Sequence, residues 1–401
     1  MGSVVQANAV QGGAHESRPR SSWRARYSSA VVLLSAMTFL PSQLRSQVVL
    51  DLPMPSQHAV VEQRVGLTDI CVSYSRPGVK GRPVWGSLVP YGFASPAMTG
   101  AIAPWRLGAN ENTTLSVTHP VMIEGRALPA GTYGLFAAMN RDSTATIIVS
   151  RESESWGSFS YDSTEDVMRV TLRTRPHAPV ELLTFAFDEV GPAHAVLSMR
   201  WADLELPLRI GVNVDSIVVA SVRRQMKMPV AFSHHSRYQA AAYLAAVNAN
   251  LDVALQWAKE AVDGVPGPLG FSGVRDFLTL TTLSDVYFLM DSVSQSKVAL
   301  DGAMQHAGDV PLGTVVFYQR SLITSRRIDH ATHMAEWMMR RWPKQWTTYD
   351  AMARVHVAQQ NYSEALIYET RALEYAGPAV RPTIEARLQL LRAGKAFNWE
   401  G

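Results

Sequence analysis

The sequence predicts an α+β multidomain protein in which an antiparallel β-sandwich domain precedes a helical region. Short β-rich runs of period two fill residues 60–212, whereas the residues after Asn213 have the period of helices. A length of 401 residues is enough for about two or three domains, each with its own core. The 22 prolines exclude one long coiled coil, and the single cysteine, Cys71, excludes an internal disulfide or a multi-thiolate metal cluster.

A basic leader opens the chain. Its first 29 residues hold four arginines and one acid, Glu16, and the 11-residue apolar run 30–40 follows. This pattern is typical of a secretory signal, and the apolar run is too short to span a bilayer. We therefore predict that residues 1–47 are a signal peptide, cleaved near Ser46 or Gln47, and that the protein is periplasmic or extracellular. The alternative is a buried N-terminal helix or strand.

Removal of the leader changes the charge of the protein. The whole chain has 37 basic and 34 acidic residues and a net charge of +3. Without the five arginines and one glutamate of residues 1–47, 32 basic and 33 acidic residues remain, so the net charge becomes −1. The net positive charge of the whole chain is therefore due to the leader. Because the rest of the protein is not basic, we expect no nucleic-acid partner. We also expect no transmembrane segment.

Residues 48–212 contain eight short β-rich runs bounded by turn-forming residues. The runs are 114–118, 121–124, 131–136, 144–150, 167–174, 180–187, 195–201 and 204–210. Polar and apolar residues alternate clearly along 167–173, which predicts one wet face and one dry face. Glu124-Gly125-Arg126 and Ala202-Asp203 are expected to be tight hairpin turns. Many short strands without helices between them predict a sandwich or a partly open barrel.

Residues 213–234 are expected to form a connecting helix and linker. Asp215 is the expected N-cap, the helix should run to about Met226, and Pro229 should end it. In residues 235–401 a sequence register then recurs four times. Its starting points are His235, Phe277, Leu312 and Trp346, at spacings of 42, 35 and 34 residues.

Small residues recur at three places in this register, and a proline closes each unit. The eighth position holds Ala242, Ser284, Gln319 and Ala353, the twentieth Ala254, Ser296, Ala331 and Ala365, the twenty-seventh Ala261, Ala303, Met338 and Ala372, and the prolines are Pro266, Pro311, Pro343 and Pro378. This pattern resembles the tetratricopeptide repeat, which implies a tetratricopeptide-like α-helical solenoid. Gln319 and Met338 depart from it, and the first spacing requires an insertion at 264–273. A last helix, 380–396, should cap the stack. The alternative is an irregular helical bundle.

Several distinctive motifs follow one another in the β region. They are Ser75-Arg76-Pro77, Lys80-Gly81-Arg82, Leu88-Val89-Pro90-Tyr91-Gly92, Trp105-Arg106-Leu107-Gly108-Ala109-Asn110-Glu111-Asn112-Thr113 and Leu128-Pro129-Ala130-Gly131-Thr132-Tyr133, then Trp156-Gly157 and Tyr161. Together they resemble the bacterial domain of unknown function 2911 over residues 70–213. The resemblance implies an exported or surface protein with a helical tail, and it brings no known reaction. Residues 93–104 are an insertion relative to that family, and Leu107 replaces its usual threonine.

Eight residues of these motifs form the candidate ligand site, with no catalytic residue assigned. They are Arg76, Lys80, Arg82, Tyr91, Trp105, Arg106, Asn110 and Glu111. If they converge, arginine forks and aromatic walls favour an anionic or glycan ligand. The alternative, which we favour, is a structural role in which an Arg–Glu pair and a capping Asn hold a long loop under Trp105.

Other polar clusters carry weaker signals. The acids between Glu152 and Asp166 are expected to form a solvated loop. His330 and His333 share a helix face, but without a metalloprotease motif a solvated face is favoured over a metal site. No nucleophile elbow and no phosphate-binding loop occurs in the sequence. Because these motifs are missing and the histidine spacing is weak, we predict neither a cofactor nor a metal.

The function predicted from the sequence is binding. The helical repeats should take a protein or peptide partner, and the β domain offers the candidate site for a small polar or glycan ligand. One alternative is an envelope hydrolase acting on glycans or peptides, with Glu111 as acid or base and Arg106 as its electrostatic partner. The other is a structural scaffold.

Overall fold

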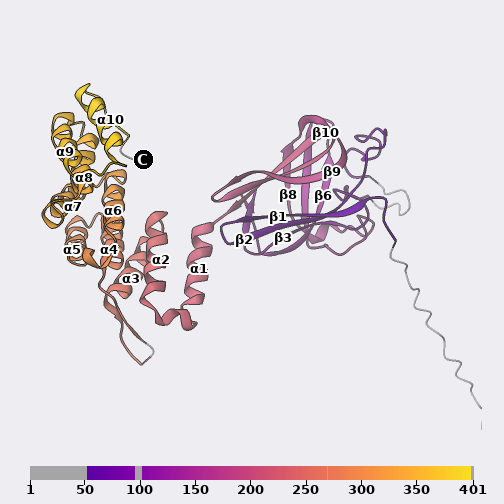
Figure 1. Cartoon of the computed structure of the whole chain (residues 1–401). Coiled ribbons are helices and arrows are strands. Elements are labelled where there is room, and N and C mark those ends of the chain that lie inside the picture. Colours follow the sequence, from indigo (N-terminus) through magenta and orange to yellow (C-terminus); the bar gives the residue numbers. More distant parts are fainter. Residues whose placement is uncertain (1–51, 95–101, 269, 399–401) are drawn as a thin grey trace, which may run out of the picture. The chain divides into compact units, whose positions relative to one another are not determined.

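The computed structural model describes residues 52–94, 102–268 and 270–398. The expected signal peptide of residues 1–47 lies outside the described residues. A β region and a helical region follow each other along the chain, and each is described by itself (Figure 1).

The β region consists of two antiparallel sheets. The larger sheet has six strands in the order β1 (Gln57–Val65), β2 (Thr68–Arg76), β3 (Thr113–Val117), β6 (Gly131–Met139), β7 (Thr144–Ser150) and β8 (Asp166–Arg173). The smaller sheet has four strands in the order β5 (Arg126–Leu128), β4 (Val121–Ile123), β10 (His194–Val212) and β9 (Arg175–Gly191). Neighbouring strands are antiparallel throughout both sheets. The predicted antiparallel β architecture is therefore confirmed.

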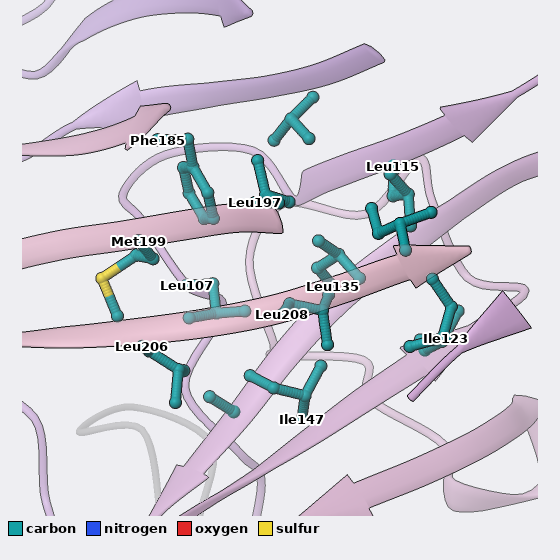
Figure 2. Packing of buried hydrophobic residues seen from close by; sticks show 14 of the residues in the cluster. Leu107, Leu115, Ile123, Leu135, Ile147, Phe185, Leu197, Met199, Leu206 and Leu208 are labelled. Atoms are coloured by element: carbon teal, nitrogen blue, oxygen red, sulfur yellow. The ribbon is translucent and has the colours of Figure 1, made fainter. Parts of the chain in front are cut away.

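One hydrophobic core joins the two sheets. Figure 2 shows Leu197, Met199, Leu206 and Leu208 of β10 in the same cluster as Leu115, Leu135 and Ile147 of the larger sheet. The void among these side chains is about 10 Å³, roughly the space of one water molecule. The two sheets therefore pack as layers around a close-packed interior, which is the arrangement of a sandwich.

The local patterns of the sequence account for several strands. In β8 the residues Met168 and Val170 are buried while Arg169 and Thr171 are exposed, so the predicted alternation is confirmed. The turn between β4 and β5 consists of Glu124 and Gly125, both at positive φ (48° and 77°). Two such residues make the hairpin turn that matches the twist of the strands, and this predicted turn is also confirmed.

The turn expected at Ala202-Asp203 is wrong. The strand β10 runs through these residues, and β9 and β10 form one long hairpin that pairs Gly191 with His194 at its tip. The pairing register shifts on both sides of Ala202, whose φ is 48°. A bulge of this kind bends a strand without ending it, and in the sequence it looks like a turn.

Ten α-helices lie within the described residues after the β region. They are α1 (Val214–Gln225), α2 (His234–Ala246), α3 (Leu251–Asp263), α4 (Phe277–Leu289), α5 (Val293–Gln305), α6 (Leu312–Thr324), α7 (Ile328–Arg341), α8 (Trp346–Ala358), α9 (Tyr362–Tyr375) and α10 (Arg381–Arg392). The N-cap of α1 is Asn213, whose side chain accepts from the Ser216 amide, and not the expected Asp215. Asparagine caps as well as aspartate does, so the helix begins two residues earlier than expected.

The four starting points of the sequence register coincide with helix starts. Phe277, Leu312 and Trp346 are the first residues of α4, α6 and α8, and His235 is the second residue of α2. The insertion expected at 264–273 contains a short hairpin of β11 (Gly264–Val265) and β12 (Phe271–Ser272).

The twentieth and twenty-seventh positions of the register are fully buried. Every residue at these two positions is 0% exposed: Ala254, Ser296, Ala331, Ala365, Ala261, Ala303, Met338 and Ala372. Gln319, the exception at the eighth position, is also buried, and its amide donates to the carbonyl oxygens of Ala331 and Ala351 at 3.4 and 3.3 Å. Small side chains at these points let adjacent helices approach closely.

A buried group of charges joins α8, α9 and α10. Asp350 on α8 accepts from Arg354 at 2.9 Å and from Arg387 on α10 at 2.8 Å. Glu369 on α9 is fully buried, and its carboxylate has no hydrogen-bond partner within the described part of the chain; it pairs with Arg387 at 3.7 Å. Burial, and next the negative charge of Asp350, raises the pKa of Glu369 to about 8.

We expect Glu369→Gln to remove a pH dependence of stability. Because the folded-state pKa of Glu369 lies above its value in the unfolded chain, its contribution to stability is full at low pH and is lost as the pH rises towards 8. Above pH 8 the variant should exceed wild type by about 2–4 kcal/mol, with little difference near pH 4. Urea denaturation followed by helical circular dichroism measures this. The exposed Glu374→Gln on the same helix is the control, and an equal pH profile in wild type and Glu369→Gln would contradict the prediction.

Candidate functional site

An open cleft of about 450 Å³ lies on the β region. Four separate segments of the chain line it, mostly with small polar side chains. The lining residues are Met54, Ser56, His58, Ser73, Tyr74, Ser75, Asn110, Glu111, Asn112, Thr114, Ser153, Glu154 and Ser155.

Strand pairing places one wall of the cleft. His58 of β1 lies opposite Ser75 of β2, and Ser73 of β2 lies opposite Thr114 of β3, so these side chains share one face of the larger sheet. His58 Nε2 lies 3.3 Å from Ser73 Oγ. This wall therefore carries hydroxyl groups and one imidazole.

The loop before β3 forms the other wall. Asn110 has a left-handed backbone with φ of 58°, a conformation that asparagine tolerates better than most residues. Its side-chain amide donates to the Ser56 carbonyl oxygen at 2.9 Å and to Ser75 Oγ at 3.2 Å. Ser75 in turn donates to the carboxylate of Glu111 at 3.4 Å. Asn110 thus fixes the loop to the sheet and places Glu111 in the cleft.

Arg106 supports this loop from outside the cleft. Its guanidinium donates to the Asn110 carbonyl oxygen at 2.6 Å and lies 5.2 Å from the ring centre of Phe159. Gly157 leaves the space for it, because a Cβ at that position would lie 2.2 Å from Arg106 Cζ. Burial lowers the pKa of Arg106. The side chain therefore acts on the backbone of the loop and does not line the cleft.

Trp105 is partly buried and packs against the core of the sandwich. Its ring stacks on Trp201 at 5.7 Å between centres and meets Trp85 edge-on at 6.0 Å. Its indole nitrogen donates to the Gly108 carbonyl oxygen at 3.3 Å. The aromatic wall expected from the sequence is thus an anchor for the loop and not a surface of the cleft.

The remaining four candidate residues lie elsewhere in the β region. Arg76 donates to the Leu183 carbonyl oxygen and to Thr184 Oγ1, which ties β2 to β9. The Lys80 amide donates to Glu181 Oε1. Arg82 donates to the carbonyl oxygens of Gly78 and Val79, and Tyr91 lies under the guanidinium of Arg141.

The eight candidate residues therefore do not converge in one pocket. Asn110 and Glu111 line the cleft, while Arg106 and Trp105 support it from behind. Arg76 and Arg82 instead donate to backbone carbonyl oxygens within their reach, and Lys80 is held through its backbone N–H, which donates to the Glu181 carboxylate.

Sequence reasoning missed Glu154. It was expected in a solvated acidic loop, but Asn112 holds that loop against the cleft through two bonds, from its amide side chain to the Glu152 carbonyl and from its backbone N–H to the Ser155 carbonyl, both 3.1 Å. Glu154 and Ser155 consequently line the same cleft as Glu111. No local pattern could have shown this, since the contact joins residues about 40 positions apart.

The two histidines of α7 do not share a site. His330 is buried and its Nε2 lies 3.2 Å from Ser296 Oγ, whereas His333 Nε2 lies 2.6 Å from Asp301. Burial lowers the pKa of His330. The solvated face expected from the sequence is therefore wrong for His330. Across the described part of the chain, no three or more His, Cys, Asp and Glu side chains are grouped so as to hold a metal ion.

The comparison with known families identifies the β region. Residues 56–210 match the model of a family described as a protein of unknown function (DUF2911). The resemblance inferred from the motifs is therefore confirmed for this region. No curated protein matches the chain. The helices of residues 52–94, 102–268 and 270–398 include none with the length and apolar character needed to cross a membrane.

We expect Arg106→Ala to destabilise the β region, whereas Glu111→Gln should not. Loss of the guanidinium leaves the Asn110 carbonyl without its donor, which costs about 1–3 kcal/mol, while a change at the exposed Glu111 stays within about 0.5 kcal/mol. Hydrogen exchange of the β-strand amides reports on this region alone. Equal protection in the two variants would show that Arg106 is not the anchor.

Proposed function

We propose that this is an exported protein of the bacterial envelope that acts by binding. The cleft of the β region holds a small polar or glycan ligand, and the helical region presents a surface to a protein or peptide partner. The observation that carries the proposal is the 450 Å³ cleft with its lining of hydroxyl, amide and carboxylate groups.

The chemistry of the cleft supports a hydroxylated ligand. Serine and threonine hydroxyls both donate and accept hydrogen bonds, and asparagine supplies a donor and an acceptor. Five serines, one threonine and two asparagines line the cleft. Its volume falls in the usual range of about 300–1,000 Å³ for small-molecule sites. A wall of this kind can exchange water for the hydroxyls of a sugar at little cost.

A second groove supports a partner for the helical region. It has a volume of about 380 Å³ and is lined by α2, α4 and α6. Small side chains such as Ala242 and Ser325 leave room in it. Asp285 and Arg327 line this groove and pair with each other, and Asp285 also accepts from Tyr318 at 2.6 Å. The starts and buried positions of the helices agree with a tetratricopeptide-like stack, whose grooves take extended peptides.

The basic leader and the family match of the β region support export. N-terminal sequencing of the mature protein should begin near Ser46 or Gln47. An uncleaved leader on cytoplasmic protein would contradict this part of the proposal.

A hydrolase is the second candidate function. The observation in its favour is that Glu154 joins Glu111 in the cleft, since glycoside hydrolysis uses two carboxylates. The role expected for Arg106 as partner of Glu111 finds no support, because its guanidinium bonds the Asn110 carbonyl. Turnover of a bound glycan that is lost in Glu111→Gln would favour this function over binding.

We expect a glycan to bind the full chain in the cleft of the β region. Ser153→Trp should weaken that glycan at least about tenfold, because the indole fills the cleft that Ser153 lines. Calorimetric titration of a mono- and disaccharide panel measures this. Ser87→Trp, at an exposed position outside the cleft, is the matched control. Equal affinities in the two variants would place the ligand elsewhere.

Peptide binding to the helical groove has its own test. Ser325 and Thr324 are neighbouring exposed residues, but only Ser325 lines the groove. On a peptide array, Ser325→Trp should lose about tenfold or more of the affinity that Thr324→Trp retains, since it occludes the groove. Peptides that bind both variants equally would show that this groove is not the binding surface.

A further inference from the structure

The carboxylates that line the β-region cleft are not balanced by a lysine or an arginine. Glu111 and Glu154 both line it, His58 is its one imidazole, and the described lining residues include no lysine and no arginine. Arg106, which lies behind the loop, directs its guanidinium to the Asn110 carbonyl. The sequence suggested an anionic ligand because of the nearby arginines, and the structure reverses the charge of the surface that a ligand meets.

The two carboxylates have no ionic partner among the described residues. Glu111 accepts only from Ser75 Oγ, through Oε2, and Glu154 accepts no hydrogen bond from the described protein groups. Ser75 is itself held by the Asn110 amide at 3.2 Å, so the hydroxyl that donates to Glu111 is positioned by the fold. Two unneutralised carboxylates in one concave surface concentrate a negative potential there.

A buried acceptor points to the same chemistry. Asn112 lines the cleft, is 6% exposed, and uses its amide NH₂ group to bond the Glu152 carbonyl. Its amide oxygen has no hydrogen-bond partner among the residues that the structure describes. A buried acceptor without a donor is costly. A protonated primary amine has three donors and no acceptor, so it complements this acceptor together with the two carboxylates.

We propose that the cleft recognises a ligand that carries a protonated primary amine beside hydroxyl groups, as amino sugars do. This rests on the proposed binding function of the cleft. The carboxylates of Glu111 and Glu154 neutralise the ammonium group, and the serine hydroxyls bond the hydroxyls of the ring. An organic cation fits better than a metal ion, because the described residues include no group of three or more His, Cys, Asp and Glu able to ligate one.

Binding of three sugars distinguishes recognition of the ammonium charge from recognition of the sugar ring. Glucosamine carries the ammonium group, N-acetylglucosamine has it capped as a neutral amide, and glucose has a hydroxyl in its place. Titrated calorimetrically into the full chain near pH 6.5 and at low salt, glucosamine should bind about tenfold more tightly than the two neutral sugars. Added salt should reduce this preference, because it screens charges that solvent reaches.

Charge-neutral variants identify the carboxylates responsible. Glu111→Gln and Glu154→Gln should each lower the ratio of glucosamine to N-acetylglucosamine affinity by roughly three- to tenfold. Glu62→Gln should leave the ratio unchanged, because Glu62 is exposed on the same strand as His58 but does not line the cleft.

The outcomes distinguish this inference from the function on which it rests. If all three sugars bind equally and the variants keep the wild-type ratio, the cleft binds sugars but does not recognise an amine. If the neutral sugars or glucuronate bind more tightly than glucosamine, the inferred charge is wrong. If no sugar binds at all, both the amine recognition and the proposed sugar-binding cleft are overturned.

Discussion

The partly buried Trp105 stacks on Trp201, a buried residue of the core that the two sheets share, and the cleft depends on this contact. The stack fixes the start of the loop that leads into β3. From there Arg106 bonds the backbone of Asn110, and the Asn110 side chain bonds Ser56 and Ser75. Each step places the next, so a hydrophobic contact in the interior determines where the polar groups of the surface lie.

The basic residues of the β region stabilise the fold, and the acidic residues define the cleft. Arg76 bonds β9, and Arg106 bonds a loop carbonyl from a half-buried position. Guanidinium groups suit this role because their five donors can satisfy several carbonyl oxygens at once. Glu111 and Glu154 both line the cleft, and neither has a basic partner among the described residues. The motif residues thus divide into supporting and lining groups.

The helical region is held by two different kinds of contact. Small residues at fixed positions, such as Ala254 and Ala331, allow close approach of adjacent helices. At its C-terminal end, Arg387 of α10 instead reaches the buried carboxylates of Asp350 and Glu369. Buried charges of this kind are costly unless paired, and they specify one position of the last helix more narrowly than apolar packing would.

Local periodicity and contiguous motifs are enough to predict most strands of the β region, the helix starts at Phe277 and Trp346, and the family that the β region matches. The sequence by itself did not determine the bulge at Ala202 or the lining of the cleft. The cleft joins segments near residues 56, 74, 111 and 154, which only strand pairing and the Asn112 contacts bring together. A polar side chain is left for a ligand only if no internal partner lies within hydrogen-bond distance of it. The folded chain alone sets those distances.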